Sequence, residues 1–342
     1  MSTSTTESTS TSATRPAGPW RSAWQHVRKD KVAMASLAVL IFIVLACIAA
    51  PLYADHIAHL DPFTSNVNGT YTIDGVTKPV LEASTEGLGL GVNPIGPTWK
   101  FSTYFLGADN QGRDVFARML YGGRNSLMIG FASAVICCVL AGIVGVVSGY
   151  FGHGVDAVLS RAMDVLWAFP VYLLAICLSV VLINSTIQVG PITLTSGSLL
   201  LPILIIGVVF VPYVARPIRG QVMSLREREF VLAAIGAGAA DSRLLRREIL
   251  PNVLPTLIVF LPLMTAINML TESALSFLSI GVQPPDASWG TIINDGVGLL
   301  YTRPMVAIAP GIMLAITAVA LNLLGDGVRD ALDPKARLRG SI

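Results

Sequence analysis

Long stretches without a charged residue constrain this chain more than any other feature. Val32 to Ala54 is uncharged, Asn125 to Val155 is a second such stretch, and Val165 to Ala215 is the longest. A transmembrane helix needs about 20 mainly apolar residues, and a backbone in lipid must satisfy its hydrogen bonds internally. Only 13% of the 342 residues are charged, against roughly 25% in soluble domains. We therefore expect an all-α polytopic membrane protein rather than a soluble enzyme, and the net charge of +2 gives no indication of nucleic-acid binding.

The spacing of these stretches predicts six transmembrane helices. The first two lie in Val32–Ala54 and Asn125–Val155. The stretch Val165–Ala215 is too long for one span, and polar or glycine-rich residues at 184–186 and 190–198 divide it into two. The fifth span runs from about Val253 to Gly281 and the sixth from about Pro304 to Gly325.

The distribution of Lys and Arg predicts the orientation. With six spans both termini lie on one side of the membrane, and 17 of the 23 Lys and Arg residues fall on that side. Cytoplasmic loops carry the excess of basic residues, so both termini are expected to be cytoplasmic. The predicted organisation is a disordered tail at 1–30, span one at 31–54, an extracytoplasmic segment at 55–120, a core with spans two to six at 121–326 that includes a cytoplasmic loop at 216–252, and a cytoplasmic tail at 327–342.

The extracytoplasmic segment contains the pattern of a small hairpin. Thr70–Ile73 and Val76–Thr77 flank Asp74-Gly75, a sequence typical of a tight turn. We expect the segment either to contact an extracytoplasmic partner or to be a passive surface loop. His56 and His59, with Asp55 and Asp61, form the one histidine cluster, for which a metal site is less favoured than an ordinary helix end.

No catalytic pattern is found in the sequence. A phosphate-binding loop needs a Gly-rich turn followed by Lys, and no Lys of this chain follows Gly. We therefore expect no enzymatic activity, no catalytic residue and no cofactor or metal bound by this chain. The cysteines all fall in apolar stretches and are expected to be small buried hydrophobic residues: Cys47, Cys137, Cys138 and Cys177.

The cytoplasmic loop contains a short amphipathic helix. Phe230, Ala233, Ala234 and Ala237 recur at i, i+3, i+4 and i+7, which gives one face of small residues. Glu227 and Glu229 precede it, Gly238 is expected to end it, and Asp241 to cap a second short helix. Such a short helix is marginally stable alone in water, so it must pack against a surface. That surface is either the chain's own membrane domain or a groove on a cytoplasmic partner.

This loop resembles the EAA loop of ABC-importer permeases. The resemblance covers residues 228–241 and continues at 249–252. Ala233, Ala234, Gly238, Leu250 and Pro251 match the motif at its spacing. Leu232 stands where the motif has Glu, and Glu248 where it has Ile.

Further stretches, in the same order as in the family, resemble the dipeptide, oligopeptide and nickel permeases, and within them the "C"-type subunit. The resemblance covers roughly Leu106 to Pro334, while the stretch 64–103 looks longer than the usual family loop. The matching stretches are Leu106–Asp109, Gly112–Asp114, Gly123–Leu127, Arg161 and Asp164 with Ala168–Pro170, Thr271–Leu278, Gly281–Pro285, Ser288–Gly290 and Leu324–Pro334.

The resemblance implies the type I ABC-importer permease fold in a bacterial inner membrane. It implies half of a translocation path for di- or oligopeptides delivered by an extracytoplasmic binding protein. A second homologous permease and two ABC ATPase domains, which bind ATP and Mg, would complete the importer. A nickel importer of the same family and an ion-coupled secondary transporter are the alternatives. The residues implied to couple to the ATPase are Arg228, Glu229, Phe230, Ala233, Ala234, Ala237, Gly238 and Asp241.

Glu272 is the one carboxylate well inside a predicted span. Asn268, Glu272, Ser276 and Ser279 are spaced by four, four and three residues, which places them on one helix face. An ionisable residue in a membrane faces the bundle interior or a water-filled cavity. The face is therefore either a wall of the translocation path or an interhelical hydrogen-bond clamp.

Aromatic residues next to prolines are further candidates for the path. A path for peptides is expected to be broad and weakly specific, with small, polar and occasional aromatic residues on its wall. The candidates that fit this description are Phe169, Pro170 and Tyr213. They lie at the two positions where Pro170 and Pro212 are expected to kink their helices.

Overall fold

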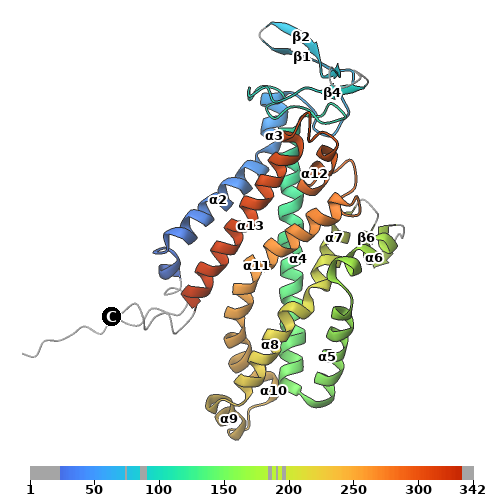
Figure 1. Ribbon diagram of the computed structural model, residues 1–342. Coiled ribbons are helices and arrows are strands. Elements are labelled where there is room, and N and C mark those ends of the chain that lie inside the picture. Colours follow the sequence, from blue (N-terminus) through green and yellow to red (C-terminus); the bar gives the residue numbers. More distant parts are fainter. Residues whose placement is uncertain are drawn as a thin grey trace, which may run out of the picture.

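The spanning helices of the computed structural model lie where the uncharged stretches predict them (Figure 1). The structure describes residues 24–73, 75–84, 91–183, 187–189, 192–194 and 198–332. Within these, four stretches are long and apolar enough to cross a membrane, and two bent helix pairs bring the number to six. The four are α2 (Lys31–Ile48), α4 (Val115–Phe151), α11 (Leu250–Phe277) and α13 (Met305–Leu332). The six predicted spans are thus confirmed by length and composition.

The remaining two spans are broken at the expected prolines. Helix α5 (His153–Ala168) meets α6 (Val171–Ile183) at an angle of 87° across Phe169-Pro170. Helix α7 (Leu200–Val209) meets α8 (Val211–Arg226) at 42°, with Pro212 in the first turn of α8. Proline has no N–H to continue the preceding hydrogen-bond ladder, which explains why the chain bends at these positions.

Aspartate caps fix the start of two spans. The Asp30 carboxylate accepts hydrogen bonds from the backbone N–H of Val32 at 2.8 Å and of Ala33 at 3.3 Å. Asp114 accepts from the N–H of Ala117 at 2.8 Å at the start of α4. A side-chain acceptor at this position satisfies N–H groups that have no partner within the helix, so each apolar stretch begins as a helix at a defined residue.

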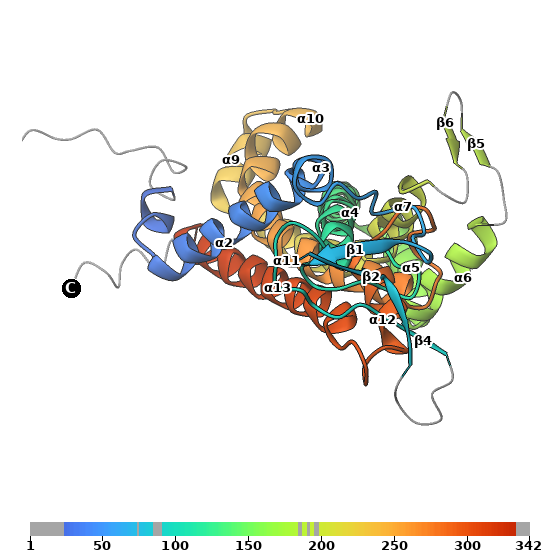
Figure 2. The same ribbon diagram turned by 90° about the horizontal axis from the view of Figure 1, so that it is seen from above.

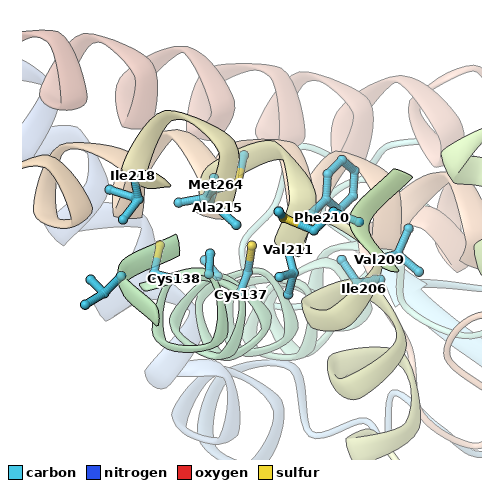
Figure 3. Packing of buried hydrophobic residues seen from close by; sticks show 14 of the residues in the cluster. Cys137, Cys138, Ile206, Val209, Phe210, Val211, Ala215, Ile218 and Met264 are labelled. Carbon is cyan, nitrogen blue, oxygen red and sulfur yellow. The ribbon is translucent and has the colours of Figure 1, made fainter. Parts of the chain in front are cut away.

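Helix α4 is the centre of the bundle and packs against α2, α7, α8 and α11 (Figures 1 and 2). Cys137 and Cys138 of α4 meet α7, α8 and α11 in the largest apolar cluster, where Met264 of α11 is buried (Figure 3). A Cβ atom on Gly145 would lie 2.8 Å from the carbonyl oxygen of Ala215, so only glycine permits this approach of α4 and α8. Close contact through small residues is the usual way in which helices associate in lipid.

Short elements occupy the two ends of the bundle (Figure 1). The predicted hairpin is confirmed: Ile73 pairs with Val76, and its strands lie at the opposite end from α9 and α10. The end with the hairpin carries α3 (Ala50–Tyr53), η1 (Ala54–Ala58), β1 (Thr70–Ile73), β2 (Val76–Pro79), β3 (Leu81–Ala83), β4 (Val92–Pro94) and α12 (Trp289–Val297). The other end carries α9 (Glu229–Gly236), α10 (Asp241–Leu244) and η2 (Leu245–Ile249), while β5 (Ile187–Val189) and β6 (Ile192–Leu194) join α6 to α7.

Several predicted boundaries are corrected by the structure. Disorder over 1–30 is wrong for the last residues of that range, because residues 24–27 form a helical turn in which Val27 packs against Ala33 and Ala331. Helices α4, α8 and α13 each run past the predicted segment limits, since helices can extend beyond the lipid. Cys177 is exposed on α6, unlike the other cysteines. The predictions at 1–19, 184–186 and 333–334 lie outside the described residues.

Candidate functional site

Helix α9 projects from one end of the bundle and carries apolar side chains outward. Phe230, Leu232 and Ile235 are 42%, 54% and 48% exposed. Val231 is buried, and half-buried Ala234 packs against the main core, so these two residues fix the helix to its own chain. The predicted small-residue face of Phe230, Ala233, Ala234 and Ala237 is therefore largely exposed. An exposed apolar surface of this kind marks an interaction site.

The ends of α9 are largely as predicted. Arg228 is extended at the start, and Glu229 occupies the first turn. Gly238 has φ +79°, and its N–H donates to the carbonyl of Ile235 at 2.9 Å, so the helix ends just before it. The predicted cap of α10 is wrong, because Ala240 occupies the capping position and the Asp241 carboxylate has a different partner.

That partner anchors the loop to the end of α4. The Tyr150 hydroxyl donates to Asp241 Oδ1 at 2.7 Å, and Arg226 Nη1 donates to the Tyr150 carbonyl oxygen at 2.8 Å. Tyr150 of α4 is thus bonded to one residue that precedes α9 in the chain, Arg226, and to one that follows it, Asp241. The segments before and after α9 are therefore both bonded to the central helix.

A second anchor joins α4, α5 and α8. Arg219 Nε and Nη2 each donate to a carboxylate oxygen of Asp156 at 2.5 Å, and the hydroxyls of Ser148 and Ser160 donate to the same carboxylate. Bidentate Arg–carboxylate contacts define geometry as well as adding energy, so this pair fixes how α5 and α8 are oriented where they meet.

The predicted aromatic candidates for the path lie at the span breaks. Phe169, Pro170 and Tyr213 are all exposed. The Tyr213 ring lies 6.3 Å from that of Trp167 and 6.4 Å from that of Phe260, measured between centroids. Helices α5, α8 and α11 therefore contribute to one aromatic surface.

Two charged residues at this surface, Asp164 and Arg216, were not among the path residues predicted from the sequence. Arg216 Nη2 lies 3.0 Å from Asp164 Oδ1, and the Arg216 guanidinium lies 4.8 Å from the centroid of the Trp167 ring. Asp164 and Arg216 are the residues that immediately precede and follow the uncharged stretch Val165–Ala215. That position was the available signal, because two bent spans between them return the chain to the same level of the bundle.

The polar face of α11 lies inside the bundle. Asn268, Glu272 and Ser276 are buried, which favours the clamp over the path wall for these three residues. Glu272 accepts hydrogen bonds from Ser276 at 2.7 Å and from Ser126 of α4 at 2.9 Å. Asn268 Nδ2 donates to Ser133 Oγ of α4 at 3.0 Å. The face thus joins α11 to α4.

A cluster of four charged residues lies at the end with the hairpin. Arg113 bridges Asp109 at 2.8 Å and Asp295 of α12 at 3.1 Å, and Arg118 pairs with the same two carboxylates. Burial is the largest cause that raises the pKa of the neighbouring Asp114 to about 6. A cavity of about 550 Å³ borders Arg113, Arg118 and Asp295. In the part of the chain that the structure describes, no group of three His, Cys, Asp or Glu residues is arranged to hold a metal ion.

Two family profiles match the sequence. Residues 141–338 match the binding-protein-dependent transport system inner membrane component, and residues 18–69 match the N-terminal TM domain of oligopeptide transport permease C. The two matches cover the first span with its flanking residues and the chain from the last part of α4 through α13. They agree with the resemblance in the cytoplasmic loop and elsewhere.

Curated relatives match over nearly the whole chain. The dipeptide transport system permease protein DppC of Alkalihalophilus pseudofirmus is 31% identical over 319 residues, which is 93% of this chain and 91% of the relative. The oligopeptide transport system permease protein OppC of Bacillus subtilis is 34% identical over 318 residues, 93% of this chain and 90% of the relative. A putative peptide transport system permease protein of Brucella abortus is 41% identical over 240 residues, 69% and 75% of the two chains.

A solved structure has the same fold. A chain of the inward-facing MetNI methionine ABC transporter superimposes with a TM-score of 0.50 at 18% identity. The match covers 63% of this chain and 96% of that chain. It identifies the arrangement of helices as that of an ABC-importer permease.

Proposed function

The chain belongs to the family of binding-protein-dependent transport system inner membrane components, and on this premise we propose that it forms half of a path for di- or oligopeptides. As a permease subunit of an ABC importer it is a multi-pass inner membrane protein. The peptide substrate is supported by the names of its relatives, which are dipeptide and oligopeptide permeases. A second homologous permease would supply the other half of the path.

The energy for transport would come from partner subunits. The sequence has no Gly-Lys phosphate-binding loop, so ATP and Mg would be bound by two ABC ATPase domains on the cytoplasmic side. An extracytoplasmic binding protein would deliver the peptide at the end with the hairpin. The excess of Lys and Arg near the termini and around α9 supports a cytoplasmic position for both termini.

The exposed apolar side chains of α9 are the observation that carries this proposal. Phe230, Leu232 and Ile235 are exposed to water in the isolated chain, which is unfavourable unless a partner covers them. A groove on an ATPase that surrounds the projecting side of α9 would bury these side chains. The coupling residues predicted from the sequence, from Arg228 to Asp241, would then all lie at or next to that contact.

The anchors described above suggest how coupling would work. Closure of the ATPases would displace α9. Because Tyr150 contacts both Asp241 and Arg226, this displacement would move the end of α4. The Asp156–Arg219 pair would move α5 together with α8. Motion of these helices would reshape the exposed aromatic surface at the span breaks. We place Phe169, Pro170 and Tyr213 on the path wall, and Asn268, Glu272 and Ser276 behind it as a clamp.

A double substitution tests the coupling role of α9. In a Phe230→Asp and Ile235→Asp variant, two exposed apolar side chains of α9 would become charged while Val231 keeps its buried contacts. We expect loss of the ATPase subunits from the purified complex and loss of peptide-stimulated ATP hydrolysis. Co-purification and the hydrolysis rate are the measurements.

The control is Ser242→Asp, an exposed position on the neighbouring helix α10 at the same end of the bundle. This variant should retain both ATPase association and hydrolysis. Full association and normal coupling in the double variant would contradict the role assigned to α9.

A further inference from the structure

Two Arg–Asp pairs join the same helices, α5 and α8, but they are built differently. In the pair Asp156–Arg219, the carboxylate receives two bonds from the guanidinium and two more from serine hydroxyls, and the side chains are 18% and 31% exposed. In the pair Asp164–Arg216, a single contact of 3.0 Å joins side chains that are 54% and 42% exposed. The first pair is saturated. The second leaves most of its hydrogen-bonding capacity open.

The open pair lies next to both span breaks. The Arg216 guanidinium lies over the ring of Trp167, and this ring lies beside that of Tyr213. The bend at Phe169-Pro170 comes shortly after Trp167 in the chain, and the bend at Phe210 comes shortly before Tyr213. Phe260 of α11 extends the same surface. A cation, an anion and aromatic faces therefore meet where the two spans change direction.

The level of this pair in the bundle follows from α4. The Ala215 carbonyl lies against Gly145 of α4. Gly145 comes 20 positions after Asn125, the first residue of the uncharged part of α4. This is about 30 Å along the helix, the thickness of the hydrocarbon core. Arg216 is thus at the inner boundary of that core. Both side chains are partly exposed at this level, so they can accept new partners.

We propose that Asp164 and Arg216 bind the two charged termini of a transported dipeptide at the cytoplasmic end of the path, with Trp167 and Tyr213 packed against the peptide. The inference rests on the peptide-import function proposed above. A dipeptide is singled out because its termini are close enough together to reach two side chains that lie 3.0 Å apart, whereas each further residue of an extended peptide adds about 3.5 Å. The peptide carboxylate takes the place of Asp164 on Arg216, and the peptide ammonium group takes the free Asp164, so each charge exchanges one partner for another.

Photo-crosslinking identifies what touches this surface. The complete importer is placed in lipid vesicles with its binding protein, ATP and a labelled peptide that the wild type imports. In this preparation, the Trp167→p-benzoylphenylalanine variant should form a crosslink to the peptide. Adding Arg216→Gln should lower the yield of the peptide adduct and the initial uptake rate about tenfold, the loss of one charge-assisted hydrogen bond.

Arg161→Gln is the matched comparison, because Arg161 is an exposed arginine of α5 that belongs to neither pair. It should leave both the amount of intact complex and the adduct yield per complex unchanged. Adducts with lipid only, or with the partner permease only, would overturn the inference, as would equal effects of the Arg216 and Arg161 substitutions per intact complex. If the wild-type importer takes up no peptide at all, the proposed function itself fails, which is a separate result.

Discussion

At the scale of single residues, Glu272 shows how a carboxyl group can be placed in a membrane without a cation beside it. Among the described residues no ion pair involves Glu272, and its hydrogen bonds come from the hydroxyls of Ser126, Ser273 and Ser276. Glu272→Gln keeps an acceptor and the shape of the site, so the complex should unfold within a few degrees of the wild type. Glu272→Leu leaves the hydroxyls without their acceptor and should lower the free energy of unfolding by about 2 kcal/mol. Thermal unfolding of the purified complex measures both.

Transport by the Glu272→Gln variant decides between the two roles considered for this residue. A clamp predicts nearly normal uptake, because helix packing is preserved. Loss of uptake in a variant that assembles and unfolds normally would instead mean that the carboxylate acts on the path.

At the scale of elements, the charged cluster at the hairpin end joins the start of α4 to α12. Arg118 is buried and pairs with both Asp109 and Asp295, so Arg118→Gln leaves two carboxylates with only Arg113. Removing one member of a buried ion cluster costs about 3 kcal/mol or more. We expect a lower unfolding temperature and faster proteolysis of the segment that contains α12.

Arg124→Gln is the control for this cluster, because Arg124 is an exposed arginine further along the same helix. It should leave unfolding and proteolysis unchanged. Equal stability of the two variants would show that the cluster does not hold α12 in place.

At the scale of the whole molecule, the bundle has two ends that the orientation proposed above assigns to opposite sides of the membrane (Figure 1). The Cys177→Ser substitution first removes the exposed cysteine. Two variants are then made in this background: Thr77→Cys introduces a cysteine in the hairpin, and Ser242→Cys introduces one in α10. A membrane-impermeant maleimide added to intact cells should label the first variant only. After the membrane is opened it should label both.

The reverse labelling pattern in intact cells would invert the topology and would place α9 away from any cytoplasmic ATPase. The proposed coupling would then be wrong even though the family assignment would remain. This experiment therefore tests the orientation independently of transport.

Local sequence was sufficient for features that depend on neighbours in the chain. The uncharged stretches located the spans because lipid selects for continuous apolar helices, and Asp74-Gly75 located the hairpin between β1 and β2. Pro170 and Pro212 located the bends, since a missing N–H acts where it occurs. The cap assigned to Asp241 failed because Tyr150, distant in sequence, provides a stronger partner for its carboxylate.

The sequence by itself determined that this chain is a six-span permease, because the hydrophobic pattern and the family motifs are both linear properties. Only the tertiary structure decided which side chains face outward. It buried Glu272 against α4, exposed Phe230 and Ile235, and brought Asp164 beside Arg216 across two bent spans. A helix with apolar residues on every side carries no periodic signal of its inner face, so burial inside a membrane bundle is set by the neighbouring helices rather than by polarity.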